Sequence, residues 1–117
     1  MTHDELAIDG IDTEGGLKRL GGKRERYEAL LLKFADKQAL TVVGVRAALA
    51  AGDLATAERD LHSLKGAAAS LGANALAEAA ANAEQSLKAG HGADVGLRHL
   101  EVALDTVVHA IRSKLDA

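Results

Sequence analysis

The sequence predicts an all-α fold, an antiparallel up-and-down four-helix bundle with a short additional N-terminal helix. Ala and Leu, both strong helix formers, dominate the composition, and strand-like alternation of apolar and polar residues is absent. Glycines divide the chain, because they stand where each apolar period breaks, as glycines do after helix ends. These glycines are Gly21, Gly22, Gly52, Gly72, Gly90 and Gly92. A chain of 117 residues is long enough for one domain with a single modest core.

The N-terminal half of the chain is expected to form two helices. Asp12 or Thr13 can cap a short helix that ends near Leu20. A long helix should then run from about Arg24 to Ala50, because its apolar face repeats about every 3.6 residues with only two polar interruptions. The face is formed by Tyr27, Leu30, Leu31, Phe34, Gln38, Thr41, Val42, Val45 and Leu49.

The C-terminal half is expected to form three more helices. Asp53 is the expected cap of the first, Asn74 caps the second, and the last begins near Asp94. Their apolar stripes are Leu54, Ala57, Leu61, Leu64, Ala68 and Leu71; Leu76, Ala80, Ala83 and Leu87; and Leu97, Leu100, Leu104, Val107, Val108, Ile111 and Leu115. Short connections between amphipathic helices favour an antiparallel bundle over residues 11–117, with residues 1–10 as a flexible tail.

Composition and charge exclude several classes of function. The chain has no Cys, so it has no disulfide framework, no thiolate nucleophile and no Cys-ligated metal. A net charge of −3 and only one Phe and one Tyr give neither the positive charge nor the stacking rings that bind nucleic acid. No apolar run approaches the roughly 18 residues of a membrane span, and the acidic start does not resemble a signal peptide. We therefore expect a cytoplasmic protein without nucleic-acid or membrane contacts.

Motifs for most catalytic chemistries are missing. The sequence has no GxxxxGK[ST] nucleotide loop, no GxGxxG after a strand, no GxSxG nucleophile elbow and no HExxH zinc motif. No histidine has a Glu three residues before it, which excludes the Glu-x-x-His pairs of di-iron bundles. We therefore expect no cofactor, no ATP site and no dedicated metal site, although Glu58 and His62 at i,i+4 could hold adventitious zinc.

Among the five histidines, His62 has the most unusual surroundings. At about 100° per residue it lies roughly 130° from the centre of its apolar stripe, so it should face solvent. Gly66 at i+4 and Ala69 leave almost no side chain beside the ring, and Lys65 at i+3 can reach back over it. This pattern points to a transiently phosphorylated imidazole, with an ordinary surface histidine as the alternative. Surface or loop positions are expected for the others: His3, His91, His99 and His109.

The residues that follow His62 resemble the signature of histidine-containing phosphotransfer (Hpt) domains. Residues 62–73, HSLKGAAASLGA, match the pattern His-x-Leu-Lys-Gly, four small residues, then Leu-Gly-Ala, which surrounds the phosphoaccepting histidine of that family. Residues 50–53 resemble the turn before the family's active helix, and residues 11–22 resemble its N-terminal helix and Gly-Gly turn. The resemblance covers about residues 10–115 and implies the same bundle with an extra N-terminal helix.

The resemblance also implies a role for each site residue. His62 would be the phosphoacceptor, Lys65 the charge partner of the phosphoryl group, and Gly66 the clearance for a docking partner. The family's fourth helix usually supplies Glu or Gln near the acceptor ring, and both the family's spacing and the helical wheel favour Glu84 over Gln85. Glu84 would accept the Nδ1–H of His62 and leave Nε2 free as the nucleophile; a solvated glutamate is the alternative.

The implied function is that of a phosphorelay intermediate without autokinase activity. The receiver domain of a hybrid sensor kinase or response regulator would bring the aspartyl phosphate, the acidic pocket and Mg²⁺, and His62 would pass the phosphoryl group to a second receiver. The implied docking surface has a flat part formed by Ala55, Gly66 and Ala69, and a rim of Arg59, Lys65, Ser63 and Ser70. We expect a monomer.

Two other functions stay open at this point. One is the dimerisation and phosphoacceptor domain of a sensor kinase. Such domains usually carry an acidic residue directly after the histidine and a Pro a few residues on, whereas Ser63 follows here and the chain has no Pro. The other is a helical interaction module that binds receiver or kinase domains without accepting phosphate.

Overall fold

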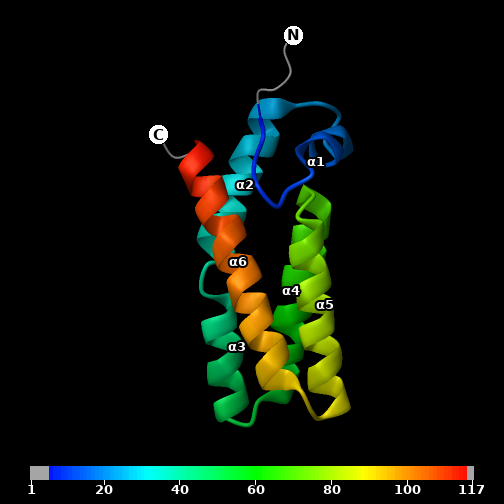
Figure 1. Cartoon of the computed structure of the whole chain (residues 1–117), viewed down its shortest axis with the longest axis vertical. Helices are drawn as coiled ribbons and strands as arrows, with labels where there is room; N and C mark the ends of the chain where they lie inside the picture. Colours follow the sequence, from blue (N-terminus) through cyan, green and yellow to red (C-terminus); the bar gives the residue numbers. More distant parts are fainter. Residues whose placement is uncertain (1–5, 116–117) are drawn as a thin grey trace.

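The protein is represented by a computed structural model, described here for residues 6–115, and this range forms six helices and no strand (Figure 1). The helices are α1 (Thr13–Arg19), α2 (Arg24–Gln38), α3 (Thr41–Ala50), α4 (Leu54–Leu71), α5 (Asn74–Ala89) and α6 (Ala93–Leu115). The prediction of an all-α fold is confirmed for these residues. Within the same range, no helix has both the length and the apolarity needed to cross a membrane.

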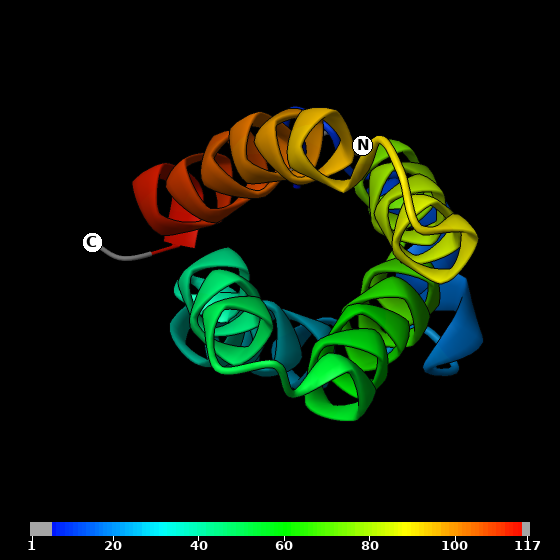
Figure 2. The same ribbon diagram turned by 90° about the horizontal axis from the view of Figure 1, so that it is seen from below.

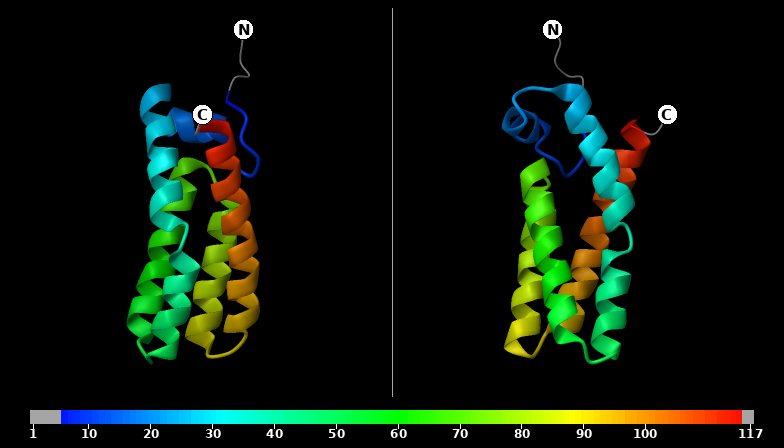
Figure 3. Two further views of the ribbon diagram at one scale, coloured as in Figure 1. Left: turned by 90° about the vertical axis from the view of Figure 1, so that its left-hand side faces the viewer. Right: turned by 180° about the vertical axis from the view of Figure 1, so that it is seen from behind.

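The long helices surround one core. Seen from the end, α3, α4, α5 and α6 follow one another around a ring (Figure 2). Helix α2 continues the column of α3 and packs against α6 (Figure 3), while α1 lies across the end of the bundle against α4 and α2. The largest fully buried side chains are Tyr27, Leu31, Val45, Leu61, Leu64, Leu76, Leu100, Leu104 and Ile111.

The prediction of one unbroken helix over residues 24–50 is wrong, because the chain leaves helical geometry at Leu40. This residue has φ −108° and ψ 17°, and its side chain is exposed. On either side of the break lie the two polar residues of the predicted apolar face, and the Thr41 hydroxyl donates a hydrogen bond to the side-chain oxygen of Gln38. The pairing gives the oxygen of a buried amide group a partner at the junction where the column passes from α2 to α3.

Two helix starts behave as their sequences predict. The Asp12 carboxylate caps α1 by accepting a hydrogen bond of 3.0 Å from the backbone amide of Gly15. The Asp53 carboxylate caps α4 by accepting two hydrogen bonds from Thr56, one from the hydroxyl at 2.6 Å and one from the backbone amide at 3.1 Å. The side-chain bond and then the backbone bond from Thr56 hold the pKa of the Asp53 carboxyl below its ordinary value.

Two predictions near helix starts are wrong. Asn74 does not cap α5, because Ala73 occupies the cap position without a side-chain bond and Asn74 is the first helical residue. Leu54, expected in the buried stripe of α4, is an exposed hydrophobic residue. It is the first residue of α4 and follows the turn from α3.

Residues 6–10, which the sequence assigns to a flexible tail, lie against the bundle. Ile8 is buried in the core, and the hydroxyl of Thr13 donates a hydrogen bond of 2.7 Å to the carbonyl of Leu6. Residues 1–5 of the predicted tail, His3 among them, lie outside the described residues.

The C-terminal end of α4 is held by the N-terminal part of the chain. Four consecutive carbonyls, residues 69–72, accept hydrogen bonds from outside α4, at a helix end that lacks the donors of a continuing helix. The Arg19 guanidinium donates to the carbonyls of residues 69 and 70, at 3.2 and 3.4 Å. The Tyr27 hydroxyl donates to the carbonyl of residue 71 at 2.6 Å, and the Asp12 amide donates to that of residue 72 at 2.8 Å. The helix that carries His62 is therefore anchored at its end by α1, α2 and the segment before them.

Candidate functional site

His62 lies on the outer face of α4, with 67% of its side chain exposed. The opposite face of the helix is buried, including the two neighbours Leu61 and Leu64 that pack into the core. This placement follows from the helical period, since His62 stands about 100° beyond Leu61 around the helix. The imidazole is therefore open to a partner while the helix beneath it is fixed by packing.

Three nitrogen-bearing side chains gather on the carboxylate of Glu84, which α5 presents beside α4. His62 Nδ1 lies 3.4 Å from Glu84 Oε2, Lys65 Nζ lies 3.3 Å from Oε1, and Lys88 Nζ lies 3.3 Å from Oε2. Only 8% of the Glu84 side chain is exposed, against 36% for Lys65 and 58% for Lys88. We call these four residues the Glu84 cluster.

The Glu84 carboxyl is ionised at neutral pH. Burial raises its pKa, but hydrogen bonds and charges from Lys65 and Lys88 together lower it by more, so the net pKa lies below the ordinary value. An ionised carboxylate only accepts hydrogen bonds, so it favours the His62 tautomer with its proton on Nδ1. The contact of 3.4 Å is longer than the usual N–H···O range of about 2.7–3.2 Å, so the ring is oriented but not tightly held.

On the C-terminal side of His62, the exposed face of α4 carries small residues. Gly66 is exposed, and a Cβ atom added to it would meet no heavy atom within 4 Å. Packing between helices therefore does not require this glycine, although it costs about 1 kcal/mol relative to Ala within a helix. The other predicted docking residues, Ala55, Arg59, Ser63, Ala69 and Ser70, are exposed as well. A glycine inside α3, Gly44, has equally open surroundings, and nothing in the structure explains it.

Comparison with known families gives a match to the Hpt domain over residues 29–114. The chain belongs to the Hpt domain family. The match includes all four residues of the Glu84 cluster together with Gly66. It begins inside α2, so α1 and the segment before it lie outside the matched region, whereas the resemblance seen in the sequence extends to about residue 10. Comparisons with curated proteins and with solved structures give no match.

Membership of this family makes the chain a phosphotransfer module of two-component signalling. Hpt domains act with receiver domains and are phosphocarriers rather than catalysts. The arrangement around His62 suits such a carrier, because it offers an accessible ring, an orienting carboxylate and two ammonium groups within one small area.

Lys88 is the cluster residue that the sequence reasoning missed. It stands one turn after Glu84, and a Glu followed by Lys at i+4 is a recognisable helix-stabilising pair that could have drawn attention to it. Gln85, the competing candidate for the residue beside His62, is exposed, as a residue about 100° further around α5 should be.

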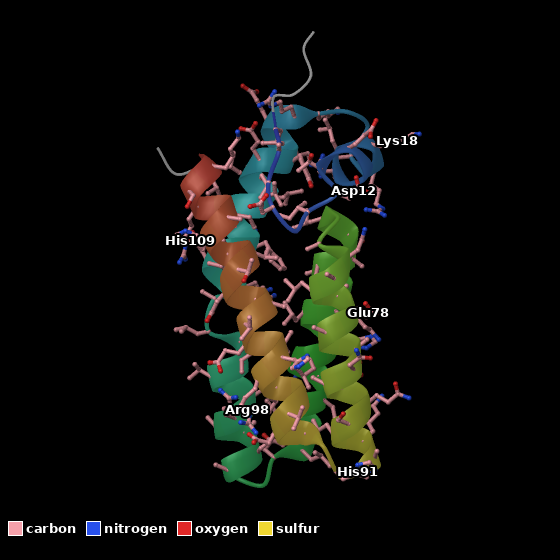
Figure 4. The ribbon with its side chains drawn as sticks, in the orientation of Figure 1. Asp12, Lys18, Glu78, His91, Arg98 and His109 are labelled. Carbon is pink, nitrogen blue, oxygen red and sulfur yellow. The ribbon has the colours of Figure 1, made fainter. Side chains whose placement is uncertain are left out.

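The other described histidines of the Hpt domain have no comparable surroundings. His91 lies at the turn between α5 and α6, and His109 lies on the outer side of α6 (Figure 4). His99 is likewise exposed on α6, and the hydroxyl of Ser113 lies 3.4 Å from Nε2 of His109. Within residues 6–115 no group of three or more His, Asp or Glu side chains is placed to hold a metal ion.

Proposed function

We propose that His62 is the phosphoacceptor of a phosphorelay, taking a phosphoryl group from a receiver-domain aspartyl phosphate and passing it to another receiver. One observation carries the proposal: an exposed imidazole, on the face of α4 opposite the core, has its Nδ1 beside the buried carboxylate of Glu84. The carboxylate orients the ring, so the lone pair of Nε2 points to the open side where a receiver can dock.

The proposed reaction needs little from the Hpt domain beyond this nucleophile. Nε2 attacks phosphorus in line, the N–P bond forms, and the P–O bond to the receiver's aspartate breaks, with the electron pair leaving on the aspartate carboxylate. Mg²⁺, held in the acidic pocket of the receiver, neutralises charge on the transferring group. Neutral imidazole is nucleophilic near pH 7, so the domain requires neither a base nor a cofactor of its own.

The docking surface that we propose for the receiver extends along α4. Its flat part is Ala55, Gly66 and Ala69, and its polar rim is Arg59, Ser63, Lys65 and Ser70. At Ser70 it borders a groove of about 320 Å³ between α2 and α4, whose apolar lining includes Leu30 and Phe34. A flat apolar patch with a polar rim suits a small, transient interface.

We further propose that the bundle is an antiparallel up-and-down one, in which α2 and α3 count as one interrupted column. Short turns between α3, α4, α5 and α6 and the packing of consecutive helices support this arrangement. We place the domain in the cytoplasm as a monomer, because its core is closed within one chain and its partners, the receiver domains, act on the same side of the membrane as their kinases.

The test is phosphoryl transfer from a phosphorylated receiver domain, with Mg²⁺, to the wild-type chain and to His62→Gln in parallel. We expect acid-labile label on wild type and none on His62→Gln, while a control variant at an exposed histidine of α6, His109→Gln, is labelled like wild type. Label that persists on His62→Gln would overturn the assignment. Receiver binding by wild type without any label would instead support the non-transferring interaction module.

A further inference from the structure

The Glu84 cluster carries more positive charge than its carboxylate neutralises. When His62 is neutral, one carboxylate faces the two ammonium groups of Lys65 and Lys88, each 3.3 Å away, which leaves a net charge of about +1. Neither lysine is deeply buried, so each side chain is free to change its position at small cost. The resting site therefore holds an excess cation before any phosphate arrives.

Phosphorylation would change this balance in a defined way. Attack by Nε2 leaves the original proton on Nδ1, so the substituted ring becomes a cation, and the phosphoryl group on Nε2 carries about two negative charges near neutral pH. The ring cation then lies beside Glu84, and the new dianion lies on the exposed side of the ring. Every charged group then has a partner of opposite charge if Glu84 pairs with the Nδ1–H of the ring cation and the two ammonium groups pair with the phosphoryl oxygens.

We propose that Glu84 holds the ammonium groups of Lys65 and Lys88 in the resting state and releases both to the phosphoryl group when His62 is phosphorylated. This inference rests on the proposed function, and it assigns Lys88 as a second phosphoryl-binding lysine. The two lysines come from different helices, α4 and α5, so they can approach the phosphoryl group from two sides. A neutral amide at position 84 could still accept a hydrogen bond, but it would offer no negative charge to hold both ammonium groups or to balance the ring cation.

Lysine side-chain NMR on the full chain tests the movement directly. The protein, labelled with ¹⁵N-lysine, is phosphorylated with phosphoramidate, a small donor that needs no receiver; Nε2 attacks phosphorus and ammonia leaves. The His62→Gln variant, treated identically, identifies lysine shifts that are caused by phosphorylation of other histidines. We expect the Nζ signals of Lys65 and Lys88 to shift on phosphorylation, while the signal of Lys37, an exposed lysine of α2, stays in place.

The outcomes separate the two proposals. Phosphohistidine at position 62 with an unmoved Lys88 signal overturns the charge transfer but leaves His62 as the acceptor. Absence of phosphohistidine at position 62, under conditions that modify other exposed histidines, overturns both. In the variant Glu84→Gln, the proposal requires the lysine signals to be displaced already in the resting state.

A second measurement asks whether the movement contributes to the transfer equilibrium. With a receiver aspartyl phosphate as donor, Lys88→Gln should shift the equilibrium about two- to fivefold toward the receiver, the size expected for one exposed charge pair. Lys88→Arg should restore it, because a guanidinium also binds phosphate, and Lys114→Gln, at an exposed lysine of α6, should leave it unchanged. An equilibrium equal to wild type in Lys88→Gln would exclude a phosphoryl-binding role for Lys88.

Discussion

The hydroxyl of Tyr27 in α2 donates a hydrogen bond of 2.6 Å to the carbonyl of Leu71, in the last turn of the helix that carries His62. Tyr27 is fully buried, so this hydroxyl has no water to replace the carbonyl. Burial, and then the negative charge of Asp12, raise the pKa of Tyr27 to about 12, against a smaller opposing effect of Arg19. The end of α4 is thus fixed by a phenol that must stay protonated.

Replacing Tyr27 with Phe should destabilise the domain without altering the chemistry of His62. The variant keeps the ring in the core but removes the donor to Leu71, which leaves a part-buried carbonyl with one partner fewer. We expect the free energy of unfolding to fall by about 1–3 kcal/mol, measured by urea denaturation. The phosphoryl-transfer rate of the folded variant should stay close to that of wild type. A urea midpoint equal to that of wild type would show that the hydrogen bond from Tyr27 to Leu71 makes no net contribution to stability.

Alkaline pH should weaken the fold through the same residue. The pKa of Tyr27 is higher in the folded state, about 12, than the value of about 10 expected in the unfolded chain. Its contribution to stability is therefore complete below pH 10 and is lost as the pH rises toward 12. Wild type should lose more stability over this interval than Tyr27→Phe, in which no phenol titrates. Parallel pH profiles of the unfolding free energy for the two proteins would contradict this assignment.

The two helical glycines with open surroundings allow a matched test of docking. In Gly66→Gln and Gly44→Gln, the new side chain meets no atom of this chain at its Cβ, and each variant should gain up to about 1 kcal/mol of helix stability. Only Gly66→Gln places bulk on the proposed docking surface, so we expect it alone to lose receiver binding and transfer, by about tenfold or more, a change of about 1.4 kcal/mol. Equal transfer rates in both variants would show that the bare surface at Gly66 is incidental.

Much of the fold could be predicted from the sequence because each helix carries a local signal. The apolar periods place the core side chains of α4, α5 and α6, and left-handed glycines such as Gly52 and Gly72 end helices where the periods stop. The break at Leu40 has no such signal. A hydrogen bond between Gln38 and Thr41 lies at the break, and in the sequence these polar residues look like ordinary interruptions of an apolar face.

The candidate site was only partly predictable, for a similar reason. The wheel favours Glu84 over Gln85, and the structure brings Glu84 to His62. Lys88 pairs with Glu84 within α5, but that His62 and Lys65 meet the same carboxylate depends on how α5 is rotated against α4, a tertiary property that no single helix encodes. The bonds from Arg19 and Tyr27 to the end of α4 go to backbone carbonyls, which leave no trace in the identity of the accepting residues.

Acid should remove the contribution of Glu84 to stability. Because its pKa is held below the ordinary value in the folded state, this contribution is complete above about pH 4.3, the unfolded value, and is lost as the pH falls further through the folded pKa. Glu84→Gln should therefore be less stable than wild type at pH 7 by roughly 1–2 kcal/mol, since it leaves two ammonium groups without their carboxylate. The deficit should shrink as the pH is lowered, whereas Glu78→Gln, at an exposed position of the same helix, should unfold like wild type. Unfolding curves recorded between pH 7 and about pH 3 decide the question, because a deficit that stays constant with pH would mean that Glu84 stabilises the bundle by packing alone.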